Sequence, residues 1–343
     1  MGNDLKKIGN QTIKLNSNPK IISTYSIVGP KEGQGPLGQY FHEVISDDTL
    51  GKDSFEKAES EMMYTAIKGA INNANIKEED IDYLFAGDLL NQITPSCYTA
   101  EEYNIPFLGI YAACATATEG LIIAANLVEA GQMNTVIVGT SSHNMTSEKQ
   151  FRNPTEYGAP KPGTATFTAT AGVSMLVSDE KISRVKIESG TIGKVVDMDQ
   201  KDPLNMGAVM APAAAETLHQ HLSDLDRTVE DYDMILTGDL GCIGKEIFKD
   251  YVKEEYQIDL EKTTYNDCGT MLYDLDKQKD VKAGGSGPTC SALVNTSYIF
   301  NLLKTKKVKR VLWIATGALF SPTFAFQKEP ILAIAHAVSL EAI

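Results

Sequence analysis

A single cysteine, Cys114, lies where a protein could do chemistry on a bound molecule. Small residues surround it, and apolar residues at helical spacing follow over residues 121–128. A short apolar run, residues 135–139, then predicts a buried strand. Cys114 is therefore expected at a strand-to-helix turn, where unpaired backbone N–H groups favour a thiolate or a bound carboxylate. The alternative is a packing role, because free cysteines are often buried.

Further candidates lie in a polar segment, residues 143–162, which is too long and polar for a simple turn. His143 begins it within Ser-Ser-His-Asn, and we expect its ring to face a central pocket. A loop histidine that only caps the strand end is the alternative. Lys149, Arg152 and Lys161 are the basic candidates. Such residues are more often surface charges than ligand contacts, so they rank below His143.

Two more positions are expected opposite Cys114. Asp239 directly follows an apolar strand predicted over residues 233–237. Gly285 and Ser286 belong to a glycine-rich turn that opens another helix, and its backbone N–H groups supply a second anion-binding helix start.

Internal repetition indicates how these positions are brought together. Residues 79–89 closely match residues 230–240, and each copy follows a helix of similar length. The turn–helix–strand unit of the cysteine recurs within residues 284–315. Two matches in the same order predict duplicated βαβ halves with parallel strands and right-handed crossovers. We place these halves at residues 1–195 and 196–343.

Composition excludes several classes of function. The net charge of −14 argues against a nucleic-acid-binding surface. The five cysteines show no metal-type spacing with histidine and no even framework, which predicts no metal site and a reducing compartment. No apolar run approaches the length of a membrane-spanning helix, so any membrane association is expected to be peripheral. Nothing in the sequence calls for a cofactor.

Four motifs together carry a family resemblance. They are Gly-Ile-Tyr-Ala-Ala-Cys-Ala-Thr (109–116), Ser-Ser-His-Asn (141–144), Glu-Lys-Gln-Phe-Arg-Asn-Pro-Thr-Glu-Tyr-Gly (148–158) and Gly-Gly-Ser-Gly-Pro-Thr-Cys (284–290). With them the chain resembles the thiolase superfamily, and within it a sporulation branch from endospore-forming bacteria. The resemblance implies a five-layer αβαβα sandwich. It also implies a homodimer paired through the strand after the nucleophile helix, residues 135–140.

The same resemblance implies a ligand, partners and a location. The sporulation branch binds dipicolinic acid (pyridine-2,6-dicarboxylic acid), free or as its calcium chelate, and helps load it into the developing spore. Other proteins of the spore dipicolinate transport assembly are the implied partners. The implied location is the developing and dormant spore, peripherally associated with the inner membrane.

Catalysis in the related ketoacyl synthases uses a cysteine, a histidine and an asparagine. Cys114 matches the cysteine, whereas Asp239 and Ser286 stand where the histidine and asparagine are expected. We therefore expect a non-catalytic dipicolinate-binding protein. An active acyltransferase that uses Cys114 is the alternative, and a scaffold with a vestigial pocket is the third possibility. The expected ligand-binding residues are Cys114, His143, Asp239, Ser286, Gly285, Lys149 and Arg152.

Overall fold

The computed structural model describes residues 7–17, 19–151 and 160–343. Its main sheet contains two groups of strands in succession. The N-terminal group contains, in spatial order, β6 (Phe107–Gly109), β5 (Tyr83–Gly87), β7 (Thr135–Ser142), β9 (Ala171–Ser178) and β3 (Lys20–Val28). The C-terminal group contains β12 (Thr264–Asp267), β11 (Met234–Thr237), β14 (Arg310–Leu319), β15 (Leu332–Ala342) and β10 (Val185–Ile192).

The two groups repeat one topology. In each group the strand order in space is third, second, fourth, fifth and first along the chain, and the fifth strand runs antiparallel to its neighbours. A single pairing, Lys186 with Lys20, joins the groups through β10 and β3. This arrangement agrees with the duplication inferred from the sequence. Because β10 pairs along β15, it lies with the C-terminal strands, although it precedes residue 196. The division at residue 195 stays a prediction.

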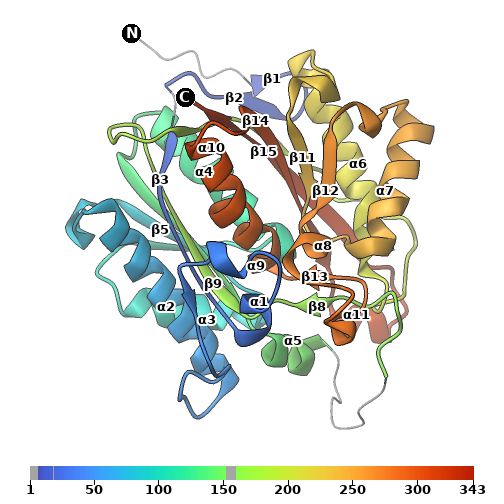
Figure 1. Cartoon of the computed structure of the whole chain (residues 1–343), viewed down its shortest axis with the longest axis horizontal. Coiled ribbons are helices and arrows are strands. Elements are labelled where there is room, and N and C mark those ends of the chain that lie inside the picture. The colour runs from blue at the N-terminus through green and yellow to red at the C-terminus, as the bar shows by residue number, and fades with distance from the viewer. Residues whose placement is uncertain (1–6, 18, 152–159) are drawn as a thin grey trace.

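Helices cover the strands on both outer faces and separate them in the middle (Figure 1). The outer helices of the N-terminal half are α2 (Phe55–Ala74) and α3 (Thr94–Glu101). Those of the C-terminal half are α6 (Met206–Leu225) and α7 (Gly241–Tyr256). The central layer contains α4 (Thr116–Glu129) and a second helix built from α9 (Pro288–Leu293), a π-helical turn η9 (Val294–Ile299) and α10 (Phe300–Lys304). The result is the expected succession of helix and strand layers.

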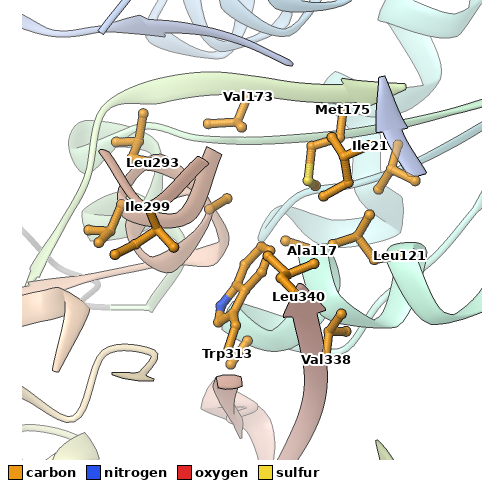
Figure 2. Close-up of a cluster of buried hydrophobic side chains, with 14 of the residues drawn as sticks. Ile21, Ala117, Leu121, Val173, Met175, Leu293, Ile299, Trp313, Val338 and Leu340 are labelled. Carbon is orange, nitrogen blue, oxygen red and sulfur yellow. The ribbon is translucent and has the colours of Figure 1, made fainter. Parts of the chain in front are cut away.

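The central core explains why α4 lies between the two groups of strands. Ala117 and Leu121 of α4 are fully buried and belong to one cluster with Met175 of β9 and with Trp313 and Leu340 of β14 and β15 (Figure 2). The buried residues of α4 extend around most of its circumference, so this helix must be covered on more than one side. This packing fixes the N-terminus of α4, and hence Cys114, at the junction of the halves.

Shorter elements complete the connections. They are β1 (Lys7–Ile8), β2 (Thr12–Lys14), α1 (Pro30–Gly33), β4 (Glu43–Val44), α5 (Asn144–Phe151), β8 (Phe167–Thr168), α8 (Cys268–Leu272), β13 (Gly285–Ser286) and α11 (Pro322–Phe326).

The expected dimer edge is wrong. Residues 135–140 belong to β7, which pairs with β5 on one side and β9 on the other and is buried along its whole length. Its apolar composition reflects burial inside the sheet and not an edge that awaits a partner. In the N-terminal group the edge strand is β6, and Leu108 at its centre is 51% exposed. The homodimer itself stays a prediction.

Candidate functional site

Cys114 lies in the turn that joins β6 to α4. A 3-10 turn, η4 (Ala113–Ala115), carries it to the N-terminus of α4, as the sequence predicts. Ala113 has φ of 50°, a left-handed conformation that is uncommon for a residue with a Cβ. The opposite half packs closely here: a Cβ on Gly317 of β14 would lie 2.3 Å from the carbonyl oxygen of Ala112. Only small residues leave room for this approach.

Asp239 and Ser286 reach the same point from the C-terminal half. Ser286 Oγ lies 3.9 Å from Cys114 Sγ and donates a hydrogen bond to Asp239 Oδ2 at 2.8 Å. The Gly287 N–H donates to the same oxygen at 3.1 Å, and the Thr316 hydroxyl donates to Asp239 Oδ1 at 2.6 Å. Asp239 is 1% exposed. It therefore acts as a buried cross-link between the end of β11, the turn before α9, and β14.

The electrostatics of this group oppose nucleophilic chemistry. Burial raises the pKa of the Cys114 thiol well above its ordinary range, and the Asp239 carboxylate raises it further. Burial also raises the pKa of Asp239, although its hydrogen bonds lower it in part. The thiolate, not the thiol, is the reactive nucleophile. Burial and Asp239 thus favour the thiol form of Cys114 over the thiolate.

Cys114 and Ser286 also line a cavity that is partly open to solvent. The cavity has a volume of about 100 Å³. This volume is smaller than the roughly 150 Å³ of an enclosed cavity known to hold benzene, but the cavity is partly open, so its size is nearer to that of one ring than to that of a long acyl chain. Part of its wall is apolar, and Phe151 and Phe320 lie on it with ring centroids 5.7 Å apart. Such a wall can pack against a flat ring.

Two hydrogen-bond donors in this cavity are available to a ligand. Lys161 Nζ lies 2.6 Å from Glu148 Oε1, and both side chains are largely buried. Ser147 is 4% exposed, and in the described part of the chain its hydroxyl has no hydrogen-bond partner. A buried hydroxyl without a partner is costly to the folded state. A bound carboxylate would accept from both Ser147 and Lys161.

His143 does not face this cavity, which corrects the expectation from the sequence. Its ring is fully buried under Phe55, with centroids 5.0 Å apart. Nε2 lies 3.0 Å from the Asp48 carbonyl oxygen, and Nδ1 accepts from the Met145 N–H at 3.1 Å. Burial lowers the pKa of His143. Both ring nitrogens are thus used by the backbone, and the histidine stabilises the start of α5.

The other predicted site residues separate into three cases. Lys149 points to the surface, where its Nζ pairs with Glu56 at 2.8 Å, and it does not line the cavity. Gly285 is buried behind Ser286, where a Cβ would lie 2.9 Å from the ring of Tyr273. Arg152 lies outside the described residues. Of the predicted set, the structure brings together Cys114, Asp239 and Ser286.

The sequence reasoning missed Ser147 and the aromatic wall. Ser147 and Phe151 are four residues apart on α5, so one face of this helix carries both into the cavity. Helical spacing within the polar segment was the signal that could have identified them. Lys161 was considered but ranked below His143, because the chain alone does not show which way each side chain points.

Two further sequence-based expectations concern metals and membranes. Among residues 7–17, 19–151 and 160–343, no group of three or more histidine, cysteine or acidic side chains is arranged to hold a metal ion. In the same part of the chain, no helix has the length and apolar character needed to cross a bilayer.

Comparison with known proteins decides the family. The sequence pattern of "Stage V sporulation protein AD (SpoVAD)" matches residues 9–341. This chain belongs to the SpoVAD family. A relative of that name from Bacillus subtilis (strain 168) is 45% identical over 338 residues, which cover 98% of both chains. The family assignment makes this a sporulation protein, as the resemblance implied.

Solved structures show where the SpoVAD fold belongs. Xanthomonas campestris OleA aligns with a TM-score of 0.59 at 15% identity, over 96% of this chain and 99% of that one. The 3-oxoacyl-[acyl-carrier-protein] synthase III from Aquifex aeolicus VF5 aligns with a TM-score of 0.55 at 15% identity, over 94% and 99%. AbyA1, a tetronic acid condensing enzyme, aligns with a TM-score of 0.59 at 13% identity, over 94% and 100%. These likenesses confirm the thiolase-like fold, and at such low identity they show the fold alone.

Proposed function

We propose that this chain binds dipicolinic acid in the cavity beside Cys114 without transferring an acyl group, and that binding serves dipicolinate uptake into the developing spore. Membership of a sporulation family supports the biological setting. The observation that carries the proposal is the cavity itself. It is of single-ring size, is walled in part by Phe151 and Phe320, and holds the unpartnered Ser147 hydroxyl and the Lys161 ammonium.

The chemistry of dipicolinate matches these groups. It is a flat aromatic ring with a carboxylate on each side of the ring nitrogen. One carboxylate would accept from Lys161 and Ser147, which both line the cavity. The ring would pack against Phe151 and Phe320. Ser286 holds its hydrogen on Asp239, so it offers oxygen lone pairs and not a donor to the ligand.

Glu148 bears on the charge state of the ligand. It pairs with Lys161 in the cavity, so the free dianion would have to draw the ammonium away from this carboxylate. A calcium chelate of dipicolinate would present its cation to Glu148 and its carboxylates to Lys161, without leaving either charge unpaired. Titration with and without calcium separates the two forms.

The absence of acyl transfer rests on the groups around the thiol. Asp239 and Ser286 occupy the places where ketoacyl synthases keep histidine and asparagine. The buried carboxylate raises the pKa of the Cys114 thiol and would oppose a developing oxyanion. An acyltransferase remains the alternative function, since Cys114 keeps its place at a helix start in a fold shared with condensing enzymes.

Partners and location follow the family. We propose that the chain works with other proteins of the spore dipicolinate transport assembly, at the inner membrane of the spore. Membership of the sporulation family supports this, and the described helices offer no membrane span of their own, so attachment would be peripheral.

Two measurements on the purified chain test the proposal together. Calorimetric titration with dipicolinate should give saturable binding near one molecule per chain, and benzoate, which has one carboxylate, should bind more weakly. Intact-mass spectrometry after incubation with acetyl and malonyl thioesters should show no turnover. Acylation of Cys114 followed by product release would establish the acyltransferase instead. If the chain shows no dipicolinate binding and no acylation, the remaining function is that of a scaffold with a vestigial pocket.

A further inference from the structure

A second hollow lies away from Cys114, between β3, the end of α2 and the helix α10. This groove has a volume of about 510 Å³. Two cationic side chains, Arg184 and Lys304, line it, and none of its described lining residues is acidic. For a chain with a net charge of −14, a groove whose described lining contains cationic but no acidic side chains is unexpected.

Neither cation is neutralised by the protein. Within the described residues, Arg184 and Lys304 form no ion pair and no side-chain hydrogen bond, whereas nearby Lys186 and Arg310 both pair with Glu341. Such unpaired guanidinium and ammonium groups in a shared hollow attract anionic oxygens. The fork of the arginine suits a carboxylate or phosphate in particular.

One face of the helix formed by η9 and α10 lines the groove. Ser297, Phe300 and Lys304 are spaced by three and four residues, so they share one face of the helix formed by η9 and α10. The π-helical turn η9 is anchored across the groove, because the Thr24 hydroxyl of β3 donates to the Thr296 carbonyl at 2.9 Å. π-Helical turns occur often at functional sites.

Neutral donors and aromatic rings complete the lining. His42 stacks on Tyr25, with ring centroids 4.7 Å apart, and its Nδ1 accepts from the Ser26 N–H at 3.2 Å. Burial lowers the pKa of His42. The ring is thus neutral, with its proton placed on Nε2 by this hydrogen bond. Tyr40 and Phe300 add aromatic surface beside the cations.

We propose that this groove binds a small molecule that carries two anionic oxygen groups, carboxylates or phosphates, next to a flat ring. Arg184 and Lys304 would each take one anionic group. The aromatic side chains Tyr40 and Phe300 would pack against the ring. The groove shares no lining residue with the Cys114 cavity. This proposal therefore does not depend on the function proposed for that cavity.

Calorimetry on the full chain tests the groove with two probes, dipicolinate and inorganic phosphate, each at constant ionic strength. The Cys114→Leu variant serves as the parent, because the larger side chain would occupy part of the other cavity and should displace a ligand from it. We expect dipicolinate to bind, and to bind more tightly than phosphate. The double variant Arg184→Gln, Lys304→Gln should lose affinity about tenfold or more, because each cation contributes a charge-assisted hydrogen bond.

The matched control is Lys253→Gln, which removes an exposed cation from α7 on the far side of the C-terminal half (Figure 1). It should bind as the parent does. Binding of dipicolinate supports the proposal, because this probe carries two anionic groups on a flat ring, whereas binding of phosphate alone would contradict the ring-bearing ligand. The proposal is overturned if neither probe binds, if the double variant binds normally, or if the control loses as much affinity.

Discussion

The same Gly-Asp-Leu motif lies at the end of the second strand of each half. Its two aspartates, Asp88 and Asp239, accept hydrogen bonds from different parts of the molecule. Asp88 accepts hydrogen bonds from the Leu90 N–H, the Ser96 N–H and the Ser96 hydroxyl, all at 2.9 Å or less and all within its own half. Asp239 instead ties together three elements around the candidate site. The end of the strand fixes the position of the carboxylate in each half. The neighbouring residues determine which elements that carboxylate links by hydrogen bonds.

The neighbours of the two aspartates differ in the same way. Asp88 lies near another acid, Glu59, whose pKa is raised to about 8 by burial first and then by the Asp88 charge. Asp239 lies near a thiol, Cys114, whose pKa is raised by burial first and then by Asp239. One aspartate therefore lies beside a buried acid within its own half, and the other raises the pKa of a cysteine at the junction of the halves. The following tests act on this contrast.

The largest effect is expected on stability from removal of either carboxylate. Asp88→Ala leaves three donors without an acceptor, two of them buried, and should lower the free energy of unfolding by about 3 kcal/mol or more. Asp239→Ala should cost less, about 2 kcal/mol, because water in the adjacent cavity can reach Ser286. Urea unfolding measures both. Equal losses would show that the cavity gives the second site no relief.

Ligand affinity should respond to Lys161 more than to any surface lysine of the same segment. Lys161→Gln removes the cavity cation and should weaken dipicolinate binding by about 2 kcal/mol, as expected for a hydrogen bond to a charged group. Lys149→Gln is the matched control, since Lys149 pairs with Glu56 outside the cavity. Calorimetry decides between them. Equal losses in the two variants would point to a general charge effect and not to a site.

The pH dependence of stability should reveal the raised pKa of Glu59, which lies near Asp88. The folded state keeps a proton on Glu59 up to pH about 8, whereas the unfolded state releases it near its ordinary value of 4.5. Stability should therefore fall as pH rises through this window, by up to about 1.4 kcal/mol per pH unit for this one proton. Glu32 and Asp267, with pKa values raised by burial to about 7, contribute in the same direction.

Glu59→Gln should make the decline with pH shallower, because the amide has no proton to lose. Urea unfolding at pH 5, 6, 7 and 8 gives the slope for both proteins. Parallel slopes in the variant and the parent would mean that Glu59 titrates normally. Ser60→Ala, which changes the next residue of α2, is the control for general effects on that helix.

The edge strands of the two halves differ in how well their side chains are covered. A substitution on the exposed edge strand should change the stability of the folded chain least of all. At β12, Tyr265 packs on Phe248 of α7 with ring centroids 5.2 Å apart. At β6, Leu108 is 51% exposed. We expect a homodimer through β6, with a mass near twice 37.3 kDa by light scattering. Leu108→Lys should give a monomer with an unchanged melting temperature; a monomer already in the parent would remove the dimer.

Much of the fold was predictable because it depends on local pattern. The strand expected at residues 135–139 and the turn before α4 follow from an apolar run and small residues, and the structure has both. Strand β12, residues 264–267, was missed because its short Thr-Tyr-Asn-Asp sequence has no apolar run. The edge assignment failed because a buried strand and an apolar edge strand look alike in one sequence.

The site was predictable only in part. Repetition placed Cys114, Asp239 and Ser286 together correctly, since the turns of two equivalent halves meet at one junction. His143 was misplaced because the chain shows where a strand ends but not which side of it the next side chain takes. Ser147 was not predicted, because its sequence position does not show that its side chain lies in the cavity. Its role depends on the missing partner of its hydroxyl, which only the packed structure shows.

Protection of Cys114 from alkylation tests the central claim most directly. The wild-type chain is treated with iodoacetamide at pH 8.5, with and without saturating dipicolinate, and peptide mass spectrometry follows each cysteine. Cys97 is exposed and serves as an internal control. The account predicts slow modification of Cys114 that dipicolinate slows further, with Cys97 unaffected. Unchanged modification of Cys114 under saturating dipicolinate would contradict it and place the ligand elsewhere.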